Sequence, residues 1–398
     1  MRLDHDLVVV GGGPAGLSTA LFAAHADPQI VARMLVLEKE PYPREKPCAG
    51  GLAGRADRAL AGIGVEVDVP SEWATGMSVA LPEGSFLRRE PRGRRIGRVV
   101  RRVEFDHRLA ERARARGIAV RDGVKVLRVA RDPDGVTVET SAGTLRTRAL
   151  VGADGVGSLV RKELAPGVAT WRAQVLEVDT EPVAQDLPRD LWHFHVVAPD
   201  FVGYLWDFPT IVDGRPMVCR GVYHLRLPGE GASTEDIGAR LAARLAELGL
   251  DLSACKKKRY AERGFSPSEP VAGARVLLVG EAAGVDPITG EGIAQAILHG
   301  ALAGPYLVDR LRTGDLSFGD FPGRFARAGV GVDHRVRHEL AHRFFGPSRV
   351  DYERALIAVP DFITLGVQYF GGLPLDKPLA ARVGLQMAAR AFVPRRPR

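Results

Sequence analysis

Residues 6–16 read Asp-Leu-Val-Val-Val-Gly-Gly-Gly-Pro-Ala-Gly, and this stretch decides the fold. The apolar, β-branched run of residues 6–10 predicts a short strand. The glycines at 11–13 predict a tight turn, and the small residues of 14–26 predict a helix with proline in its first turn. The stretch is therefore a strand-turn-helix unit.

The glycines of this unit, Gly11, Gly13 and Gly16, have the spacing G-x-G-x-x-G. The first turns the chain, the second lets a pyrophosphate approach the backbone, and the third lets the helix pack closely on the strand. Ala15 lies in the first helical turn, whose free N–H groups attract an anion. The pattern predicts a dinucleotide site formed by these four residues.

A carboxylate further along the chain supports this prediction. A second predicted strand, residues 34–37, ends at Glu38, about 20 residues after the last glycine. At that spacing a carboxylate accepts hydrogen bonds from the adenosine ribose of a dinucleotide. These residues leave open whether the nucleotide is NAD or FAD.

Two later segments also predict a strand, a turn and a helix. Residues 151–161 read Val-Gly-Ala-Asp-Gly-Val-Gly-Ser-Leu-Val-Arg, and residues 276–293 read Val-Leu-Leu-Val-Gly-Glu-Ala-Ala-Gly-Val-Asp-Pro-Ile-Thr-Gly-Glu-Gly-Ile. The three segments in this order resemble the FAD-dependent oxidoreductases of the p-hydroxybenzoate hydroxylase type. Within them, the chain is similar to the geranylgeranyl reductase family over nearly its whole length.

The resemblance implies a non-covalently bound FAD and adds residues to its site. Asp154 belongs to the second motif, and Glu281 stands where the superfamily usually carries aspartate. Gly292 and Ile293 open a helix, and the resemblance places them beside N1 and the C2 carbonyl of the isoalloxazine. Backbone N–H groups and a positive helix end at that point would stabilise the anionic reduced flavin.

Two arginines match positions that touch FAD in the superfamily. Arg44 follows the second strand, and Arg102 stands before a helix predicted at 106–116. The planar guanidinium group suits the task because it pairs with two phosphate oxygens at once. The alternative is a pair of solvated arginines, since the chain is rich in this residue.

The segment 46–52, Lys-Pro-Cys-Ala-Gly-Gly-Leu, resembles the Lys-Pro-Cys-Gly-Gly segment of geranylgeranyl reductases, with Ala49 in place of a glycine. Two glycines let the backbone approach a ring closely, and Cys48 presents a titratable thiol that could tune or protonate near the flavin. Cys48 is the candidate catalytic residue. A small buried hydrophobe is the alternative interpretation.

The segment 203–209, Gly-Tyr-Leu-Trp-Asp-Phe-Pro, places Tyr204, Trp206 and Phe208 on one face of a predicted strand. Geranylgeranyl reductases carry Tyr-x-Trp-x-Phe-Pro at the cavity for the isoprenoid chain, usually followed by lysine, where this chain has Thr210. The resemblance therefore implies that the three aromatic residues bind substrate. An aromatic stripe in the core is the alternative.

These motifs, with the resemblance that they carry, predict an α/β FAD-binding Rossmann-like domain with an antiparallel β-sheet substrate domain and a helical C-terminal region. The FAD-binding domain is expected to be discontinuous, formed by residues 1–70, 98–165 and 266–330. The substrate domain is expected at 71–97 and 166–265, and the C-terminal helices at 331–398. Smaller expected elements are a hairpin at 73–90, a three-stranded insertion at 124–147, a strand at 191–197 and a covering helix at 234–248.

Composition excludes several classes of protein. The chain of 398 residues is 45% apolar and 26% charged, which is ordinary for a globular protein and unlike a disordered one. Its three cysteines are too few for a disulfide framework. The uncharged run at 7–26 follows two acids and contains glycines and a proline, which argues against a signal peptide or membrane anchor. We expect a cytoplasmic protein, with at most a peripheral membrane contact.

Two further features are expected to be surface features. The basic run at 255–259 is typical of a solvated charge cluster, so no nucleic-acid partner is expected. His334, His338 and His342 share one helix face without an interleaved carboxylate, so no metal site is expected. That helix is the better candidate for contact with a membrane surface.

The resemblance implies a reductase of carbon–carbon double bonds in a long apolar substrate, isoprenoid or polyprenyl-quinone-like. The electron donor would be NAD(P)H or a reduced ferredoxin-like carrier. An aromatic or polyketide monooxygenase on the same fold is the first alternative. A non-catalytic flavin-binding module, whose net charge of +7 attracts RNA or membrane, is the second.

Overall fold

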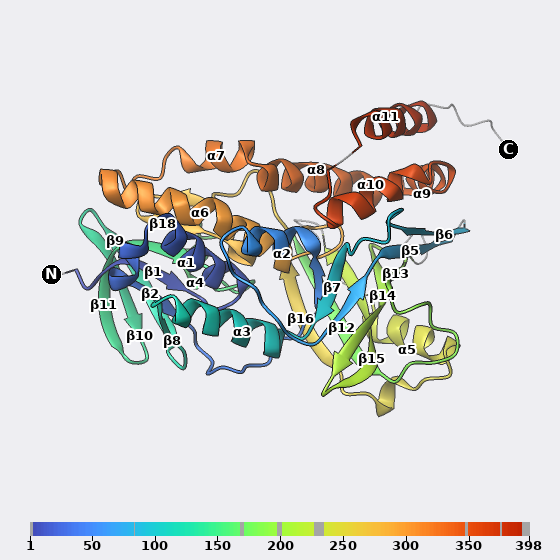
Figure 1. Ribbon diagram of the computed structural model, residues 1–398, viewed down its shortest axis with the longest axis horizontal. Coiled ribbons are helices and arrows are strands. Elements are labelled where there is room, and N and C mark those ends of the chain that lie inside the picture. The colour runs from blue at the N-terminus through green and yellow to red at the C-terminus, as the bar shows by residue number, and fades with distance from the viewer. Residues whose placement is uncertain are drawn as a thin grey trace.

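The computed structural model describes residues 3–82, 84–167, 171–196, 201–226, 235–346, 349–374 and 376–391. Within these ranges the strands form three sheets, of eight, seven and three strands (Figure 1). The eight-stranded sheet lies toward the N-terminal end of the molecule, and the seven-stranded sheet lies toward the other end. A cavity lies between these two sheets.

The eight-stranded sheet is built around β1 (His5–Val10), whose residues from Leu7 onward are buried. A continuous apolar run of this kind suits a parallel strand that is covered on both faces. Its parallel partners are β2 (Met34–Leu37) and β11 (Gly143–Gly152), beyond which lie β8 (Ala119–Arg121) and β18 (Val276–Leu278). The antiparallel members are β9 (Val126–Asp132), β10 (Gly135–Thr140) and β17 (Ala272–Gly273).

Helices cover this sheet, and two of them follow its strands β1 and β11. The helix α1 (Pro14–Ala26) follows β1 directly and packs along α6 (Ile293–Thr313), the longest helix described. The helix α3 (Arg102–Ala115) lies beside α1, and α4 (Leu159–Leu164) follows β11. The strand ends, with the turns that follow them, therefore meet at one edge, where ligands bind in open α/β sheets.

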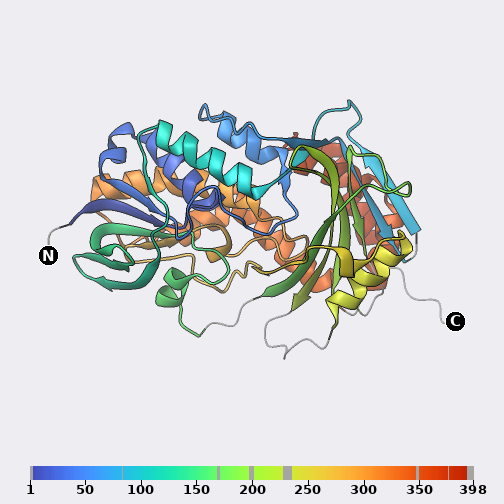
Figure 2. The same ribbon diagram turned by 90° about the horizontal axis from the view of Figure 1, so that it is seen from below.

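The seven-stranded sheet is largely antiparallel and presents two different faces. Its order is β16 (Lys258–Arg263), β12 (Arg172–Thr180), β15 (Arg215–Arg226), β14 (Gly203–Val212), β13 (Leu191–His195), β5 (Gly76–Leu81) and β6 (Gly84–Arg89). On one face α5 (Ile237–Glu247) buries Leu241 and Leu245 against Leu205 and Val222. Figure 2 shows α5, in yellow, opposite the red C-terminal helices across this sheet.

A small sheet joins the two large ones. It consists of β3 (Gly51–Ala53), β7 (Gly97–Val100) and β4 (Ser71–Ala74), with α2 (Gly54–Ala61) following β3. Short 3-10 turns complete the described elements: η1 (Pro28–Arg33), η2 (Leu252–Ala254) and η3 (Gly280–Ala282).

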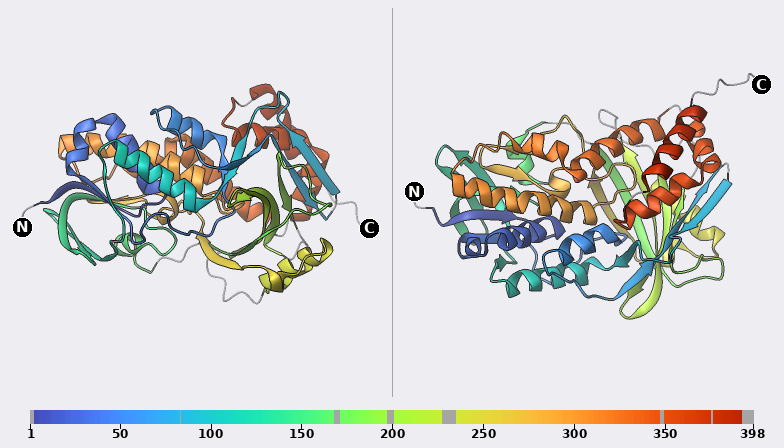
Figure 3. Two further views of the ribbon diagram at one scale, coloured as in Figure 1. Left: turned by 60° about the horizontal axis from the view of Figure 1, so that its bottom comes forward. Right: turned by 45° about the horizontal axis from the view of Figure 1, so that its top comes forward.

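The C-terminal part is helical and extends from one large sheet to the other. It consists of α7 (Phe321–Arg327), α8 (Gly329–Phe344), α9 (Arg349–Ala358), α10 (Asp361–Phe370) and α11 (Lys377–Ala391). The helix α8 packs on α6, and α9 and α10 reach the edge strand β6 (Figure 3). Among the described residues, no helix combines the length and the apolar character needed to cross a membrane.

The predicted fold class is confirmed, and several elements match closely. The helix at 14–26 and the strand at 34–37 have the predicted bounds, and the insertion at 124–147 has three strands as expected. The predicted domain boundaries stay a prediction. Of the predicted elements, residue 83 of the hairpin, residue 197 of the strand, residue 234 of the covering helix and residues 392–398 of the C-terminal region lie outside the described residues.

Three predictions are corrected by the structure. The hairpin at 73–90 is only β5 with β6, because Trp73 lies in β4 of the small sheet. The helix predicted at 106–116 begins four residues earlier, so Arg102 is its first residue. The histidine row is a surface feature only at His342, which is exposed, since His334 is fully buried and His338 is 8% exposed. The reason is that α8 packs this face against α6 and Phe265.

Candidate functional site

A cavity of about 950 Å³ lies between the two large sheets. This volume is at the upper end of the range for small-molecule sites. One part is lined by the turn after β1, the end of β2 and the start of α6, and the other part by the aromatic row of β14. The cavity therefore brings together every residue that the sequence assigned to cofactor or substrate, namely Gly11, Gly13, Ala15, Glu38, Arg44, Cys48, Arg102, Asp154, Tyr204, Trp206, Phe208, Glu281, Gly292 and Ile293, with Gly16 packed directly behind the turn.

The glycine turn is closed on one side and open on the other. A Cβ on Gly11 would lie 2.2 Å from the carbonyl oxygen of Ala153, and one on Gly16 would lie 1.9 Å from that of Gly11. Side chains are therefore excluded at both positions. Gly13 is different, because the nearest atoms to a Cβ there would be guanidinium groups 3.7 Å away, from Arg44 and Arg102. This open side is where a pyrophosphate would lie.

Both arginines are held in place by Asp106 of α3. Arg102 donates to the two carboxylate oxygens of Asp106 at 2.7 Å each, and Arg44 Nη2 lies 3.0 Å from Oδ2. Arg44 Nη2 also lies 3.3 Å from Glu38 Oε2. Arg44 Nε is buried and has no hydrogen-bond partner in the described part of the chain. A phosphate oxygen could accept this remaining hydrogen.

Glu38 is buried at the mouth of the glycine turn. Its Oε2 accepts the N–H of Gly12 at 2.9 Å, and its Oε1 accepts the N–H of Glu40 at 3.1 Å. The Tyr42 hydroxyl donates to the Gly12 carbonyl oxygen. The carboxylate is therefore fixed by the backbone before any ligand is present, and its remaining lone pairs are available to ribose hydroxyls.

The second and third motifs meet across the cavity. The carboxylate of Asp154 is hydrogen-bonded to the start of α4, where it accepts from the N–H of Leu159 at 2.7 Å and from the hydroxyl of Ser158 at 2.5 Å. Its contribution to a cofactor site is therefore mainly the shape of the turn. Glu281 stands opposite, with Oε2 3.7 Å from where a Cβ on Gly155 would lie. Burial raises the pKa of Glu281.

The loop that opens α6 forms the floor of the cavity. Gly292 is the N-cap of α6 and Ile293 its first residue, so the first N–H groups of the helix are free of intrahelical partners. The carboxylate of Glu291 is turned toward two arginines, forming ion pairs with Arg55 and with Arg337 at 3.2 Å. These pairs offset a negative charge that would otherwise oppose an anion at the helix end.

Cys48 lies in the loop between the cofactor part and the substrate part. Its N–H donates to Glu177 Oε1 at 3.1 Å, and its Sγ accepts the N–H of Gly50 at 3.4 Å. Burial raises the pKa of the thiol, so Cys48 is uncharged at neutral pH. A neutral thiol can donate a proton but is a poor nucleophile. Its catalytic role stays a prediction.

The aromatic row of β14 lines the cavity and is also packed from behind. Tyr204, Trp206 and Phe208 point to the same side of the sheet as Trp192 and Phe194 of β13, and all five belong to the cavity wall. The ring centroids of Phe194 and Phe208 lie 5.2 Å apart in an edge-to-face arrangement. The row is therefore both buried and part of the cavity wall, so the structure does not exclude either the substrate-wall or the core-stripe interpretation, and substrate binding stays a prediction.

The residues that sequence reasoning missed include Trp192 and Phe194 of the cavity wall. They also include four polar residues of the cavity or its immediate support, namely Glu177, Tyr223, Tyr260 and Glu262. The four polar residues come from β12, β15 and β16, which carry no recognisable motif. The alternation of Lys258, Tyr260 and Glu262 could have indicated a strand with one polar face. It could not have indicated that this face turns toward a cavity.

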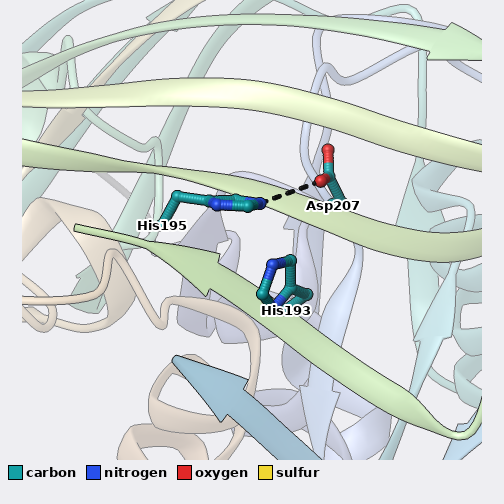
Figure 4. A group of neighbouring side chains, drawn as sticks. All are labelled: His193, His195 and Asp207. Atoms are coloured by element: carbon teal, nitrogen blue, oxygen red, sulfur yellow. Dashed lines mark hydrogen bonds and ion pairs between the residues drawn. The ribbon is translucent and has the colours of Figure 1, made fainter. Parts of the chain in front are cut away.

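On the opposite face of the same sheet, His193, His195 and Asp207 lie close together (Figure 4). His195 Nε2 is 3.0 Å from Asp207 Oδ2, but the same carboxylate lies 2.8 Å from Arg244 and 3.0 Å from Arg220. Two guanidinium groups at a single carboxylate repel a divalent cation. The cluster therefore fits an ion-pair network under α5 better than a metal site.

The fold and the cavity define a class of protein, the FAD-dependent oxidoreductases built on a Rossmann-type sheet. The family described as FAD binding domain matches residues 4–317, and the chain belongs to this family. Its similarity to geranylgeranyl reductases, indicated by the motifs, is confirmed by the relatives described next.

Two curated relatives and one solved structure are informative. A menaquinone reductase of Mycobacterium tuberculosis is 30% identical over 333 residues, covering 77% of each chain. Digeranylgeranylglycerophospholipid reductase 2 of Methanopyrus kandleri is 30% identical over 334 residues, covering 79% of this chain and 80% of its own. A geranylgeranyl bacteriochlorophyll reductase-like protein of Thermoplasma acidophilum shares the fold, with a TM-score of 0.70, 20% identity, and 98% and 96% coverage.

The residues of this chain fit FAD. The glycine turn leaves space for a pyrophosphate, two fixed arginines face that space, and Arg44 keeps a buried donor without a partner in the described part of the chain. The same cavity continues to the free N–H groups at Gly292, where a flavin ring would be supported. Glu38, Arg44, Arg102 and Glu281 would hold the cofactor.

Proposed function

We propose that the protein reduces carbon–carbon double bonds of a long, apolar, isoprenoid-like substrate with FAD as its cofactor. The observation that carries this proposal is the continuity of one cavity from the cofactor residues to the aromatic wall of Tyr204, Trp206 and Phe208. A chain of isoprene units is apolar and rich in π bonds, so aromatic rings suit it.

The printed names of the relatives support the same substrate class. A menaquinone and a digeranylgeranylglycerophospholipid both carry an isoprenoid chain, and both relatives are named reductases. Thr210 stands where the family usually has lysine, so the substrate of this chain need not be the one that either name prints. We propose the substrate class and leave the individual compound to experiment.

Separate groups of residues act on the cofactor and on the substrate. When bound and reduced, FAD supplies the hydride equivalent that adds to one alkene carbon. The N–H groups at Gly292 and Ile293 orient the ring and favour its anionic reduced form. The aromatic wall binds the apolar chain and excludes water from the reacting atoms. The reductant would be NAD(P)H or a reduced ferredoxin-like carrier.

Anaerobic reduction of the FAD-loaded protein, followed by mixing with a panel of substrates, tests the proposal. The panel contains geranylgeranyl diphosphate, a digeranylgeranylglyceryl phospholipid and menaquinone. We expect at least one of them to reoxidise the flavin and to gain two hydrogen atoms per reduced double bond, detected by mass spectrometry. Failure of every isoprenoid compound to reoxidise the flavin would contradict the proposal.

The monooxygenase alternative gives a different result in the same system. With oxygen admitted, an aromatic or polyketide substrate would be consumed together with an equal amount of oxygen and would gain one oxygen atom. The flavin-binding module without catalysis would turn over neither kind of substrate and would bind RNA or vesicles with a steep salt dependence.

A further inference from the structure

A carboxyl group with no partner among the described residues lies inside the cavity, at Glu262. It belongs to β16, where it pairs with Ala173 of β12, and it faces the same side as Tyr260. Its Oε2 would lie 2.3 Å from a Cβ placed on Gly290, so the carboxyl packs directly on the loop that opens α6. Glu262 therefore stands where the cofactor part of the cavity meets the aromatic wall.

The neighbouring carboxylate of Glu177 is satisfied, and that of Glu262 is not. Glu177 accepts from the Cys48 N–H and the Tyr260 hydroxyl, and it pairs with Lys258 at 3.2 Å. In contrast, Glu262 has no hydrogen bond or ion pair within the described residues, and its Oε2 is buried. An unpaired carboxylate in such a place would be costly, whereas the neutral acid is tolerated.

The groups that face Glu262 favour its neutral form. Burial raises the pKa of Glu262 well above its usual value, and nearby acids raise it further, opposed by Lys46. The titratable groups around it come from every neighbouring element, namely Lys46, Cys48, Glu177, Tyr204, Tyr223, Tyr260, Glu281 and Asp286. Burial and the nearby acids therefore both favour the protonated form of Glu262.

The neighbouring tyrosine hydroxyl groups already donate their hydrogens to protein acceptors. The Tyr204 hydroxyl donates to the Thr289 carbonyl oxygen at 2.5 Å, and the Tyr223 hydroxyl donates to that of Pro287 at 3.0 Å. The Tyr260 hydroxyl donates to Glu177. A proton on Glu262 would have no acceptor among the described protein groups, in a cavity where the proposed reaction needs a proton donor.

We propose that Glu262 is the general acid that protonates the second carbon of the alkene, an inference that rests on the proposed function. A hydride equivalent, supplied by the reduced cofactor, forms a C–H bond at one carbon. The O–H bond of Glu262 breaks, its proton forms the C–H bond at the other carbon, and the electron pair of the O–H bond stays on the carboxylate. The π bond is consumed, water reprotonates Glu262, and the electron donor restores the reduced cofactor.

The variant Glu262→Gln tests this role, because glutamine keeps the shape and cannot donate the same proton. We expect FAD affinity, melting temperature and flavin reduction by dithionite to stay close to wild type. Reoxidation of reduced flavin by the substrate should slow about 100-fold or more, as expected for loss of a general acid. Glu139→Gln, at a side chain that is 44% exposed, is the matched control and should change none of these values.

Infrared spectroscopy gives a readout that is independent of turnover. At pH 7 the difference spectrum of wild type minus Glu262→Gln should contain the C=O band of a neutral carboxylic acid, and the spectrum of wild type minus Glu139→Gln should lack this band. Glu262→Asp has a side chain shorter by one methylene group. Its flavin should be reduced by dithionite as in wild type, and the substrate should reoxidise that flavin at least about tenfold more slowly. If Glu262→Gln does not fold, Glu262→Asp takes its place in the kinetic test.

The outcomes separate this inference from the proposed function. If the wild type reduces an isoprenoid compound and the flavin of the Glu262 variants is reoxidised by that compound at the wild-type rate, Glu262 is not the acid. The proposed function then stands. If the neutral-acid band is not lost in Glu262→Gln, the inference is overturned as well. If the wild type reduces no such compound, both fail, even where the infrared band is present.

Discussion

His299 Nε2 lies 2.7 Å from His334 Nε2, in the buried contact between α6 and α8. The N–H of Gly280 donates to His299 Nδ1 at 2.8 Å, so the proton of His299 is on Nε2 and is donated to His334. Both rings are therefore neutral. The pair connects the C-terminal helices to the turn that presents Glu281.

This histidine pair predicts a loss of stability in acid. Burial lowers the pKa of His299 to about 3 and that of His334 well below its usual value of 6.5. Below about pH 6.5 the unfolded chain therefore binds protons that the folded chain does not. The free energy of unfolding should fall toward pH 3, by up to about 1.4 kcal/mol per pH unit for each histidine.

Urea unfolding of wild type and His334→Asn at pH 7 and pH 5 measures this effect. The variant should be less stable than wild type at pH 7 because packing is lost. Its stability should also differ less between the two pH values. Equal pH dependence in the two proteins would show that the pair does not control it.

A second prediction concerns Glu38→Ala. Loss of the ribose acceptor should weaken FAD binding at least about tenfold, since a charge-assisted hydrogen bond contributes about 1.5–3 kcal/mol. The backbone N–H groups of Gly12 and Glu40 also lose their acceptor, so the apo-protein should melt at a lower temperature. Titration of apo-protein with FAD measures the affinity, and thermal unfolding of the apo-protein measures the stability, each beside the exposed control Glu66→Ala. If Glu38→Ala binds FAD with wild-type affinity, Glu38 does not contact the cofactor.

Arg44→Gln should weaken FAD binding in a salt-dependent manner. The variant removes a guanidinium that faces the open side of the glycine turn, but Arg102 continues to hold Asp106. We expect an affinity about tenfold lower at low salt and a smaller loss at high salt, because the missing contribution is electrostatic. Arg128→Gln on the surface is the control. A loss that is the same at both salt concentrations would indicate a structural effect.

Trp206→Phe tests the aromatic wall with less damage than alanine would cause. The indole packs over Gly221 and is 3% exposed, so full truncation would leave a cavity costing about 3–5 kcal/mol. The phenyl ring should keep FAD content near wild type and change the KM for the long apolar substrate more than kcat. Trp73→Phe, away from the cavity, should leave the KM unchanged. An unchanged KM in Trp206→Phe would assign the row to the core alone.

The sequence predicted the cofactor half of the site better than the substrate half. The glycine turn and the start of α6 follow from local pattern, and Glu38 follows from its spacing after the turn, although it is held by Gly12, 26 residues away. Glu262 was missed because its position depends on pairing between β12 and β16, which are distant in sequence. The burial of His334 likewise depends on a residue 35 positions away.

The continuous cavity between the large sheets has a thermodynamic consequence. Because none of the described residues forms a wall between its two parts, a bound isoalloxazine would itself form one side of the substrate compartment. FAD and substrate must then be energetically coupled, and each raises the affinity of the protein for the other by the same factor. Apo-protein should consequently hold the isoprenoid chain weakly, and substrate should slow the dissociation of the flavin.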